Sequence, residues 1–228
     1  MTTELDTAGD GDRRIPLTRD RLLAAAVALV DADGLGALTM RALADAVGVK
    51  PMSLYHHVRD KDEILDLLVD AVFAEIPLPR PGDRWRPAMA DRAHSMRATL
   101  GRHSWAIGLL ESRRNAGPAT LAHHDAVLGV LRRDGFTVAA AAHAYALLDS
   151  FVYGFALQEA TLPFDGPDSM DDVLDGFDQL IGDTYPYLAE MLHDHVQQPG
   201  YDFADEFEIG LEVVLDGVGR LRSADRRR

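Results

Sequence analysis

Apolar residues recur every three or four positions along almost the whole 228-residue chain, and no stretch shows the alternation typical of a strand. In the first such stretch, Thr18 can accept backbone hydrogen bonds at the start of a helix, and Gly34 can end it in the left-handed conformation. The pattern therefore predicts an all-α fold. Beyond residue 80 we expect helices near 84–102, 104–113, 117–134, 137–161, 169–195 and 203–222, with Pro186 bending or breaking the fifth.

One helix-incompatible segment, PLPRPGD at 77–83, separates two helical parts of the chain. We therefore expect a disordered N-terminal tail at 1–16 and a first domain at 17–77. A second domain follows at 84–222, and a short basic tail at 223–228 ends the chain.

Composition narrows the classes of protein further. There is no cysteine, so disulfides and thiolate metal sites are excluded. The formal charge is −14, yet the stretch from Arg13 to Lys61 carries eight basic and five acidic residues, a net +3. Non-specific affinity for nucleic acid should therefore be weak and sensitive to salt. The polar N-terminus has no apolar core of a secretory signal, so a cytoplasmic protein is expected.

Residues 39–58 read as two short helices joined by a tight turn. Thr39 can cap the first helix, Gly48 can end it, and Pro51 suits the first position of the next. Apolar residues spaced to lock the helices together complete a helix-turn-helix pattern, whose second helix enters the major groove of DNA. These anchors are Leu43, Val47, Val49 and Leu54.

This stretch resembles the tetracycline-repressor (TetR) family of one-component regulators. The matching segments are LTMRALA at 38–44, GV at 48–49 and LYHHV at 54–58, followed by Lys61. The resemblance implies that Tyr55, His57 and Lys61 contact phosphates, and that Arg41, Met52 and Ser53 lie at or near base edges. Lys50 departs from the family, because a serine or threonine often begins the recognition helix there. The full set of expected DNA-binding residues is Thr39, Arg41, Lys50, Pro51, Met52, Ser53, Tyr55, His56, His57 and Lys61.

The second domain resembles the ligand-binding half of the tetracycline repressor's own subgroup, through LRRDGFT at 131–137 and FEIGLEVVLDG at 207–217. In that subgroup, the last helix and the long preceding one form a four-helix dimer interface. The resemblance implies a homodimer on a palindromic DNA operator, joined through helices near 137–161 and 203–222. One apolar seam suits either that interface or an intramolecular core; we favour the interface. The residues of this seam are Phe207, Leu211, Val214, Val218 and Leu221.

The same resemblance implies a pocket for a small-molecule effector. The subgroup holds its drug through magnesium, but its first metal-binding histidine falls near Leu110–Glu111 here and is missing, while Glu159 matches an acidic position. We therefore expect a different, largely apolar effector, with neither metal nor cofactor. The candidate lining residues are His94, Arg97, Trp105, Leu109, Leu128, Phe151, Phe155 and Glu159.

The sequence leaves other classes of protein open. A helical small-molecule carrier or sensor without DNA binding would fit the acidic balance and the missing cap. An enzyme could use a histidine–carboxylate pair such as His124 with Asp125. The clusters at 123–125 and 193–195 could bind a metal. We expect neither an enzyme nor a metal site. The apolar segment 138–157 could cross a membrane by length, but Asp149 within it favours a bundle core or a subunit interface. The expectation is a non-enzymatic, ligand-responsive transcriptional repressor with no membrane partner.

Overall fold

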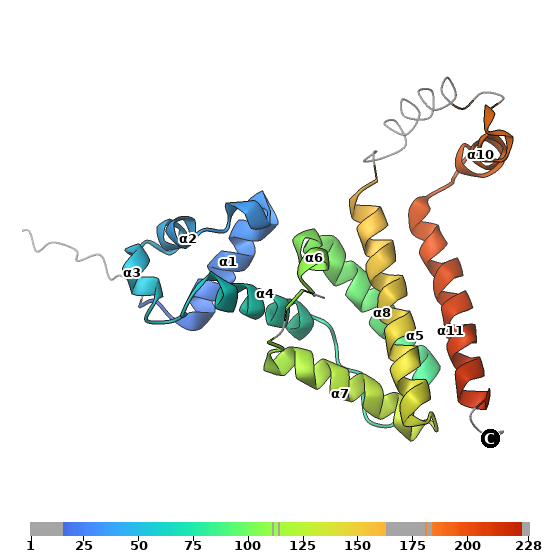
Figure 1. Ribbon diagram of the computed structural model, residues 1–228, viewed down its shortest axis with the longest axis horizontal. Coiled ribbons are helices and arrows are strands. Elements are labelled where there is room, and N and C mark those ends of the chain that lie inside the picture. Colours follow the sequence, from blue (N-terminus) through green and yellow to red (C-terminus); the bar gives the residue numbers. More distant parts are fainter. Residues whose placement is uncertain (1–15, 111, 114, 163–180, 182–183, 225–228) are drawn as a thin grey trace, which may run out of the picture. The chain divides into compact units, whose positions relative to one another are not determined.

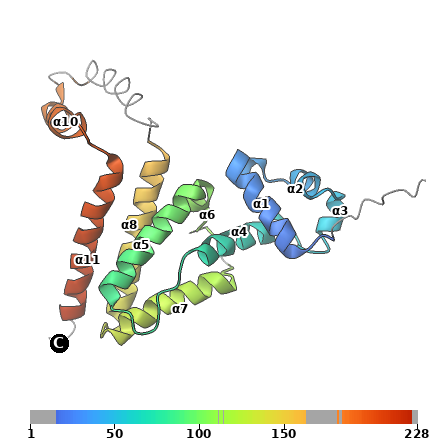
Figure 2. The same cartoon turned by 180° about the vertical axis from the view of Figure 1, so that it is seen from behind.

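The computed structural model describes residues 16–110, 112–113, 115–162, 181 and 184–224 (Figures 1 and 2). Every regular element in these ranges is helical, so the predicted all-α class is confirmed. The chain divides into two compact units, residues 1–64 and 65–228.

The first unit contains α1 (Arg19–Asp33), α2 (Met40–Val47), α3 (Pro51–Leu54) and the start of α4 (Lys61–Glu75). The two predicted threonine caps are present, whereas Gly34 ends α1 with φ of 74° and ψ of 173°, outside the expected left-handed helical conformation. Thr18 Oγ1 accepts the Arg21 amide at 3.1 Å, and Thr39 Oγ1 accepts the Ala42 amide at 3.0 Å. Gly48 ends α2 with φ of 71°, a left-handed conformation that favours glycine.

The core of the first unit forms where α1, α2 and α3 turn their apolar stripes toward one another. Arg21 Nη2 adds a hydrogen bond to the Val47 carbonyl oxygen at 3.0 Å, so the end of α2 is also fastened to α1. The apolar burial sets the orientation of the short α3 relative to the two longer helices. The fully buried side chains are Leu22, Ala26, Val30, Leu38, Leu43, Ala44, Val47, Leu54 and Val58.

The second unit is a helical bundle. Its elements after α4 are α5 (Trp85–Arg102), α6 (Ile107–Leu110), α7 (Pro118–Arg133), α8 (Val138–Ala160), α10 (Pro186–Met191) and α11 (Glu206–Ala224). The helices α8 and α11 lie side by side in both views (Figures 1 and 2). Pro186 begins α10, and a π-helical turn at Leu192–Val196 follows it. Residues 169–180 and 182–183 of the expected fifth helix lie outside the described residues.

The apolar faces of α11 correct one expectation. Phe207, Leu211 and Val218 are at most 2% exposed, so the predicted seam lies inside the chain and not at a dimer interface. The exposed apolar residues of α11 are instead Ile209 and Val213, on another face. The apolar residues do share one face of α11, as their spacing predicted. Helical spacing alone does not show whether that face packs within the chain or against a second copy.

The long helix α8 is apolar on almost all sides. By length and composition it is the one helix in the described residues that could cross a membrane, and 39% of its most apolar window is buried. Its buried face includes Leu148, Val152 and Asp149, which pairs with Arg92 inside the bundle. Its opposite face leaves Leu147 and Leu157 about half exposed, without cover from the described chain.

Candidate DNA interface and ligand site

The segment that follows Gly48 presents its polar groups outward from a fixed base. Leu54 is 0% and Val58 2% exposed, which anchors α3 and the turn after it. Met52 is 73% and Tyr55 46% exposed on the other side. None of the ten residues expected at the DNA interface is buried. Ser53 and His57 are half-buried, and the exposed ones are Thr39, Arg41, Lys50, Pro51, Met52, Tyr55, His56 and Lys61.

The start of α3 reflects the substitution of lysine for the usual capping residue. No side-chain hydrogen bond caps α3, and Pro51 occupies its first turn. The first turn is closed by the Ser53 amide, which donates to the Lys50 carbonyl oxygen at 2.9 Å. Proline lacks an amide hydrogen, so one of the donors that a cap would satisfy is absent.

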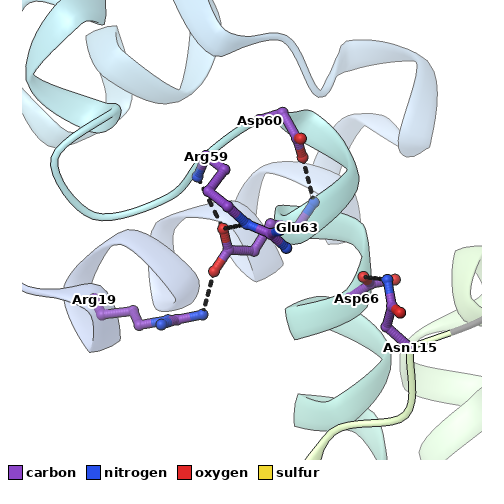
Figure 3. Close-up of polar contacts among 6 residues, drawn as sticks. All are labelled: Arg19, Arg59, Asp60, Glu63, Asp66 and Asn115. Atoms are coloured by element: carbon purple, nitrogen blue, oxygen red, sulfur yellow. Dashed lines mark hydrogen bonds and ion pairs between the residues drawn. The ribbon is translucent and has the colours of Figure 1, made fainter.

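Glu63 ties three parts of the first unit together (Figure 3). Its carboxylate accepts Arg19 Nη2 at 2.5 Å, the Arg59 amide at 2.8 Å and Arg59 Nε at 3.0 Å. The Glu63 amide donates to Asp60 Oδ1 at 2.8 Å, as expected of a helix cap. The backbone hydrogen bond from Arg59, followed by its side-chain bond, lowers the pKa of Glu63. The turn before α4 is thereby held against α1.

A second acidic face of α4 lies within the second unit and was not predicted from the sequence. Asp66 accepts Arg113 Nε at 2.6 Å and Asn115 Nδ2 at 3.0 Å, the latter drawn in Figure 3. One turn later, Asp70 Oδ1 accepts both the amide and the hydroxyl of Thr120 at 2.8 and 3.0 Å. The i, i+4 spacing of the two aspartates was the available signal. Together they hold the segment that leads into α7.

Five of the eight expected effector residues gather on α5 and α8 or at the Phe207 ring of α11. Arg97 donates to both carboxylate oxygens of Glu159, at 2.5 and 3.1 Å. Its guanidinium carbon lies 4.9 Å from the Phe155 ring centroid and 4.6 Å from that of Phe207. His94 and Phe151 also meet the Phe207 ring, with centroid distances of 5.6 and 5.3 Å. This group therefore has an apolar base with one compensated ion pair.

The other three expected effector residues lie on other elements. Trp105 packs edge-on against His103, with 5.8 Å between ring centroids. Leu109 is buried in α6, whereas Leu128 is 37% exposed on α7. Their placement in an effector pocket stays a prediction.

A buried polar network between α5, α7 and α8 was also missed. Arg92 Nη2 lies 2.7 Å from Asp149 Oδ1, and Arg92 Nε donates to His123 Nε2 at 2.8 Å. All three residues are at most 7% exposed. Burial, and then the charges of Arg92 and His124, lower the pKa of His123 to about 3, so the imidazole is neutral at physiological pH. Arg92 lies on the apolar stripe of α5 between Met89 and Met96, which was the sequence signal.

Metal binding finds no support in the described ranges. Within them, no group of three or more histidine, aspartate or glutamate side chains is arranged to hold an ion. His123 is engaged by Arg92, and His124 Nδ1 bonds the Thr120 carbonyl oxygen at 2.7 Å. The two histidines of the 123–125 cluster are thus engaged within the bundle, whereas Asp125 is exposed.

The outward α3 segment on a buried helical base, joined to a separate bundle, defines a helix-turn-helix DNA-binding regulator. Comparisons with known proteins agree. Residues 22–68 match the model described as "Bacterial regulatory proteins, tetR family", and residues 78–222 match "Tetracyclin repressor-like, C-terminal domain". The chain belongs to the TetR family of bacterial transcriptional regulators. It is accordingly a non-enzymatic DNA-binding regulator, which confirms that class and excludes the enzyme alternative.

Three relatives illustrate the similarity. An HTH-type transcriptional regulator of Saccharopolyspora erythraea is 34% identical, with 89% of this chain and 84% of the relative covered. The HTH-type transcriptional repressor DrrR1 of Streptomyces coeruleorubidus is 35% identical, with 89% and 77% covered. The crystal structure of the Streptomyces coelicolor TetR family protein ActR in complex with actinorhodin is similar with a TM-score of 0.73. It is 32% identical and covers 90% of this chain and 97% of its own.

Proposed function

We propose that this chain is a cytoplasmic, homodimeric repressor that binds a palindromic operator and is released from it by a small, largely apolar effector. The observation that carries the proposal is the recognition segment. Leu54 and Val58 are fully buried beneath it, while Met52 and Tyr55 face outward. A segment built this way can enter a major groove without rearranging its own core.

Within that segment, the proposed contacts divide by chemistry. Arg41 can bind a guanine edge through two hydrogen bonds, and Met52 and Ser53 lie near base edges in the family pattern. Tyr55, His57 and Lys61 supply phosphate contacts, which position the protein without reading sequence. Lys50 adds a phosphate contact where a capping residue is missing. The remaining expected residues, Thr39, Pro51 and His56, border these groups.

A second copy of the chain is the proposed cover for the exposed apolar face of α8 and α11. Ile209 and Val213 are four residues apart on α11 and are 62% and 68% exposed. On α8, Leu147 and Leu157 are 50% and 51% exposed. Two such pairs of helices make a four-helix interface, and the dimer places two recognition segments on one palindrome about 34–36 Å apart.

Effector release is supported by one relative and by one structural link. The crystal structure of ActR is of a complex with actinorhodin, so a protein of similar fold holds a small molecule. In this chain α4 belongs to both compact units, and its Asp66 and Asp70 hold the segment before α7. We infer that an effector in the second unit shifts α4 and so changes the spacing of the two recognition segments. The effector can shift this equilibrium only to the extent that it binds the shifted state more tightly than the DNA-binding state.

Fluorescence anisotropy with the full chain and labelled duplexes tests the proposal. Duplexes from DNA flanking its own coding region should include one that binds tightly, in a complex weakened by salt. A scrambled duplex of equal length is the control. Equal, weak binding to every duplex would contradict the proposed operator function.

A further inference from the structure

The described part of the first unit carries no excess of positive charge. Residues 16–64 contain six arginines and lysines against seven aspartates and glutamates, a net charge of −1. One of the six, Arg21, is bonded to the Val47 carbonyl oxygen within the unit. Non-specific affinity for DNA depends on how many phosphates the cations of a protein neutralise. The number of cations that can do so therefore decides how tightly this unit binds DNA of any sequence.

Two of the six cations share a single carboxylate (Figure 3). Arg19 Nη2 lies 2.5 Å from Glu63 Oε1, and Arg59 Nε lies 3.0 Å from Glu63 Oε2, so each guanidinium meets its own oxygen. The Glu63 side chain is 15% exposed, whereas those of Arg19 and Arg59 are 53% and 78% exposed. A largely covered carboxylate therefore holds two arginines that lie open to solvent.

Backbone hydrogen bonds fix the Glu63 carboxylate in place. Its Oε2 also accepts the Arg59 amide at 2.8 Å, and the Glu63 amide donates to Asp60 Oδ1 at 2.8 Å. The next residue, Ile64, is 1% exposed, which anchors the start of α4 in the apolar interior. The carboxylate is thus a negative charge in a fixed position, and it cannot follow a guanidinium that moves outward.

The two arginines lie beside the residues proposed to contact phosphates. Arg59 stands two residues after His57 and two before Lys61, on the turn that leads from α3 into α4. Lys61 is exposed, and no described carboxylate forms an ion pair with it. A DNA strand whose phosphates meet His57 and Lys61 therefore runs close to Arg59, and Arg19 meets Arg59 at the same carboxylate.

We propose that Glu63 is a specificity-determining residue, which withholds Arg19 and Arg59 from DNA phosphates. A guanidinium that keeps its carboxylate partner neutralises no phosphate, so it adds little affinity for DNA of arbitrary sequence. Arg41 and Lys61 lie outside this ion-pair cluster and keep their contacts. The ratio of operator affinity to non-specific affinity, which decides where a regulator binds, is thereby raised. The role of Glu63 rests on the proposed docking of the recognition segment, but it concerns DNA of any sequence.

Fluorescence anisotropy of the full chain on a scrambled duplex, at several salt concentrations, tests this role. The informative variant is Glu63→Gln, because glutamine still accepts the Arg59 amide but carries no charge to hold a guanidinium. It should bind the scrambled duplex about three- to tenfold more tightly at low salt. The slope of log affinity against log salt should steepen by about 0.9, the value for one added phosphate contact.

Asp20→Asn is the matched control. It removes the same charge from the residue next to Arg19 in the chain, but Asp20 is exposed and no described residue pairs with it. This variant should keep the salt slope of the natural sequence. In the triple variant Arg19→Gln, Arg59→Gln, Glu63→Gln the gain should vanish, because the released arginines are gone.

Equal or weaker binding of Glu63→Gln to the scrambled duplex, with an unchanged salt slope, overturns the proposal, because Glu63 would then only support the fold. A gain that persists in the triple variant overturns it as well. Should circular dichroism show Glu63→Gln unfolded, Arg59→Gln carries the test. It should change the salt slope by less than half as much as Lys61→Ala does, and an equal change overturns the proposal.

The outcome for Glu63 is separate from the outcome for the operator. Failure of the proposed operator function would show as equal, weak binding of the natural sequence to every duplex. Failure of the role of Glu63 would show on the scrambled duplex alone, as no gain in Glu63→Gln, whether or not an operator is found.

Discussion

Gly117 lies directly against Asp70, so closely that a Cβ built on the glycine would fall 2.2 Å from the aspartate Cγ. The approach lets Asp70 Oδ1 accept the amide and hydroxyl of Thr120 in the first turn of α7. Asp70 therefore acts as a helix cap supplied from α4, a role that residues before a helix usually fill themselves. A side chain at position 117 would have to displace the Asp70 carboxylate from this place.

Gly117→Ala should therefore destabilise the protein. The new methyl group must push the Asp70 carboxylate away, and the loss of this cap costs about 0.5–2 kcal/mol. Chemical denaturation measures the change. Gly101→Ala in α5 is the control, because a Cβ there meets nothing within 4 Å and an alanine within a helix should stabilise slightly. A stability of Gly117→Ala equal to that of the natural sequence would show that the contact has no energetic role.

At the DNA interface, Arg41→Ala and Lys61→Ala should fail in different ways. If Arg41 reads a base edge, its loss costs about 1–3 kcal/mol on the cognate operator and little on scrambled DNA. If Lys61 contacts phosphate, as proposed, its loss should weaken both duplexes alike and reduce the slope of affinity against salt. Anisotropy at several salt concentrations separates the two. Equal losses on both duplexes for Arg41→Ala would remove it from the base-reading set.

Sequence reasoning succeeded where one residue and its chain neighbours decide the geometry. Thr18, Thr39, Gly48 and Pro51 were placed correctly, because a cap or a helix end needs only local hydrogen bonds and a permitted φ. The outward face of the recognition segment followed from the same local pattern.

Sequence reasoning failed where a residue's contacts depend on which distant segment of the chain packs against it. Arg92 and Asp149 are far apart in sequence, and neither residue by itself predicts that the two form a buried ion pair. Likewise, α11 carries apolar residues on two faces. Spacing identifies both faces, but only the fold shows that Phe207 turns inward while Val213 stays exposed.

The exposed apolar face of α11 offers a test of the proposed homodimer. Val213→Glu places a charge on the proposed four-helix interface and should shift the protein toward a monomer, with weaker operator binding as a consequence. Sedimentation velocity measures the shift. Leu121→Glu is the control, since Leu121 is 57% exposed on α7, outside the proposed interface, and should leave the dimer intact. A monomeric natural sequence, or a dimer unaffected by Val213→Glu, would contradict this interface.

The Arg92–Asp149 pair should behave as a buried ion pair does. Arg92→Met alone leaves a buried carboxylate without its cation and should cost about 3–5 kcal/mol. Adding Asp149→Leu should recover most of that loss, because two apolar side chains of similar volume replace the pair. Denaturation of the two single variants and the double variant gives the coupling. Additive losses would show that the two charges do not depend on each other.

His123 should make stability depend on pH in one window. Its folded pKa of about 3 lies below the ordinary value of 6.5, so between them only the unfolded state takes up the proton. The free energy of unfolding should therefore fall by about 1.4 kcal/mol per pH unit as the pH drops below 6.5, with no contribution above it. Denaturation between about pH 5 and 6.5 avoids most carboxylate titration.

His123→Gln separates this effect from other titrations. Glutamine can still accept the Arg92 Nε hydrogen bond but cannot be protonated, so the slope in that window should become smaller by about one proton. His56→Gln is the control, because His56 is exposed in the recognition segment and should leave the slope unchanged. If both variants keep the slope of the natural sequence, the buried imidazole is not its source. In that case, His123 would not be as buried in solution as in the closed bundle, because a partly open bundle would let water reach α7.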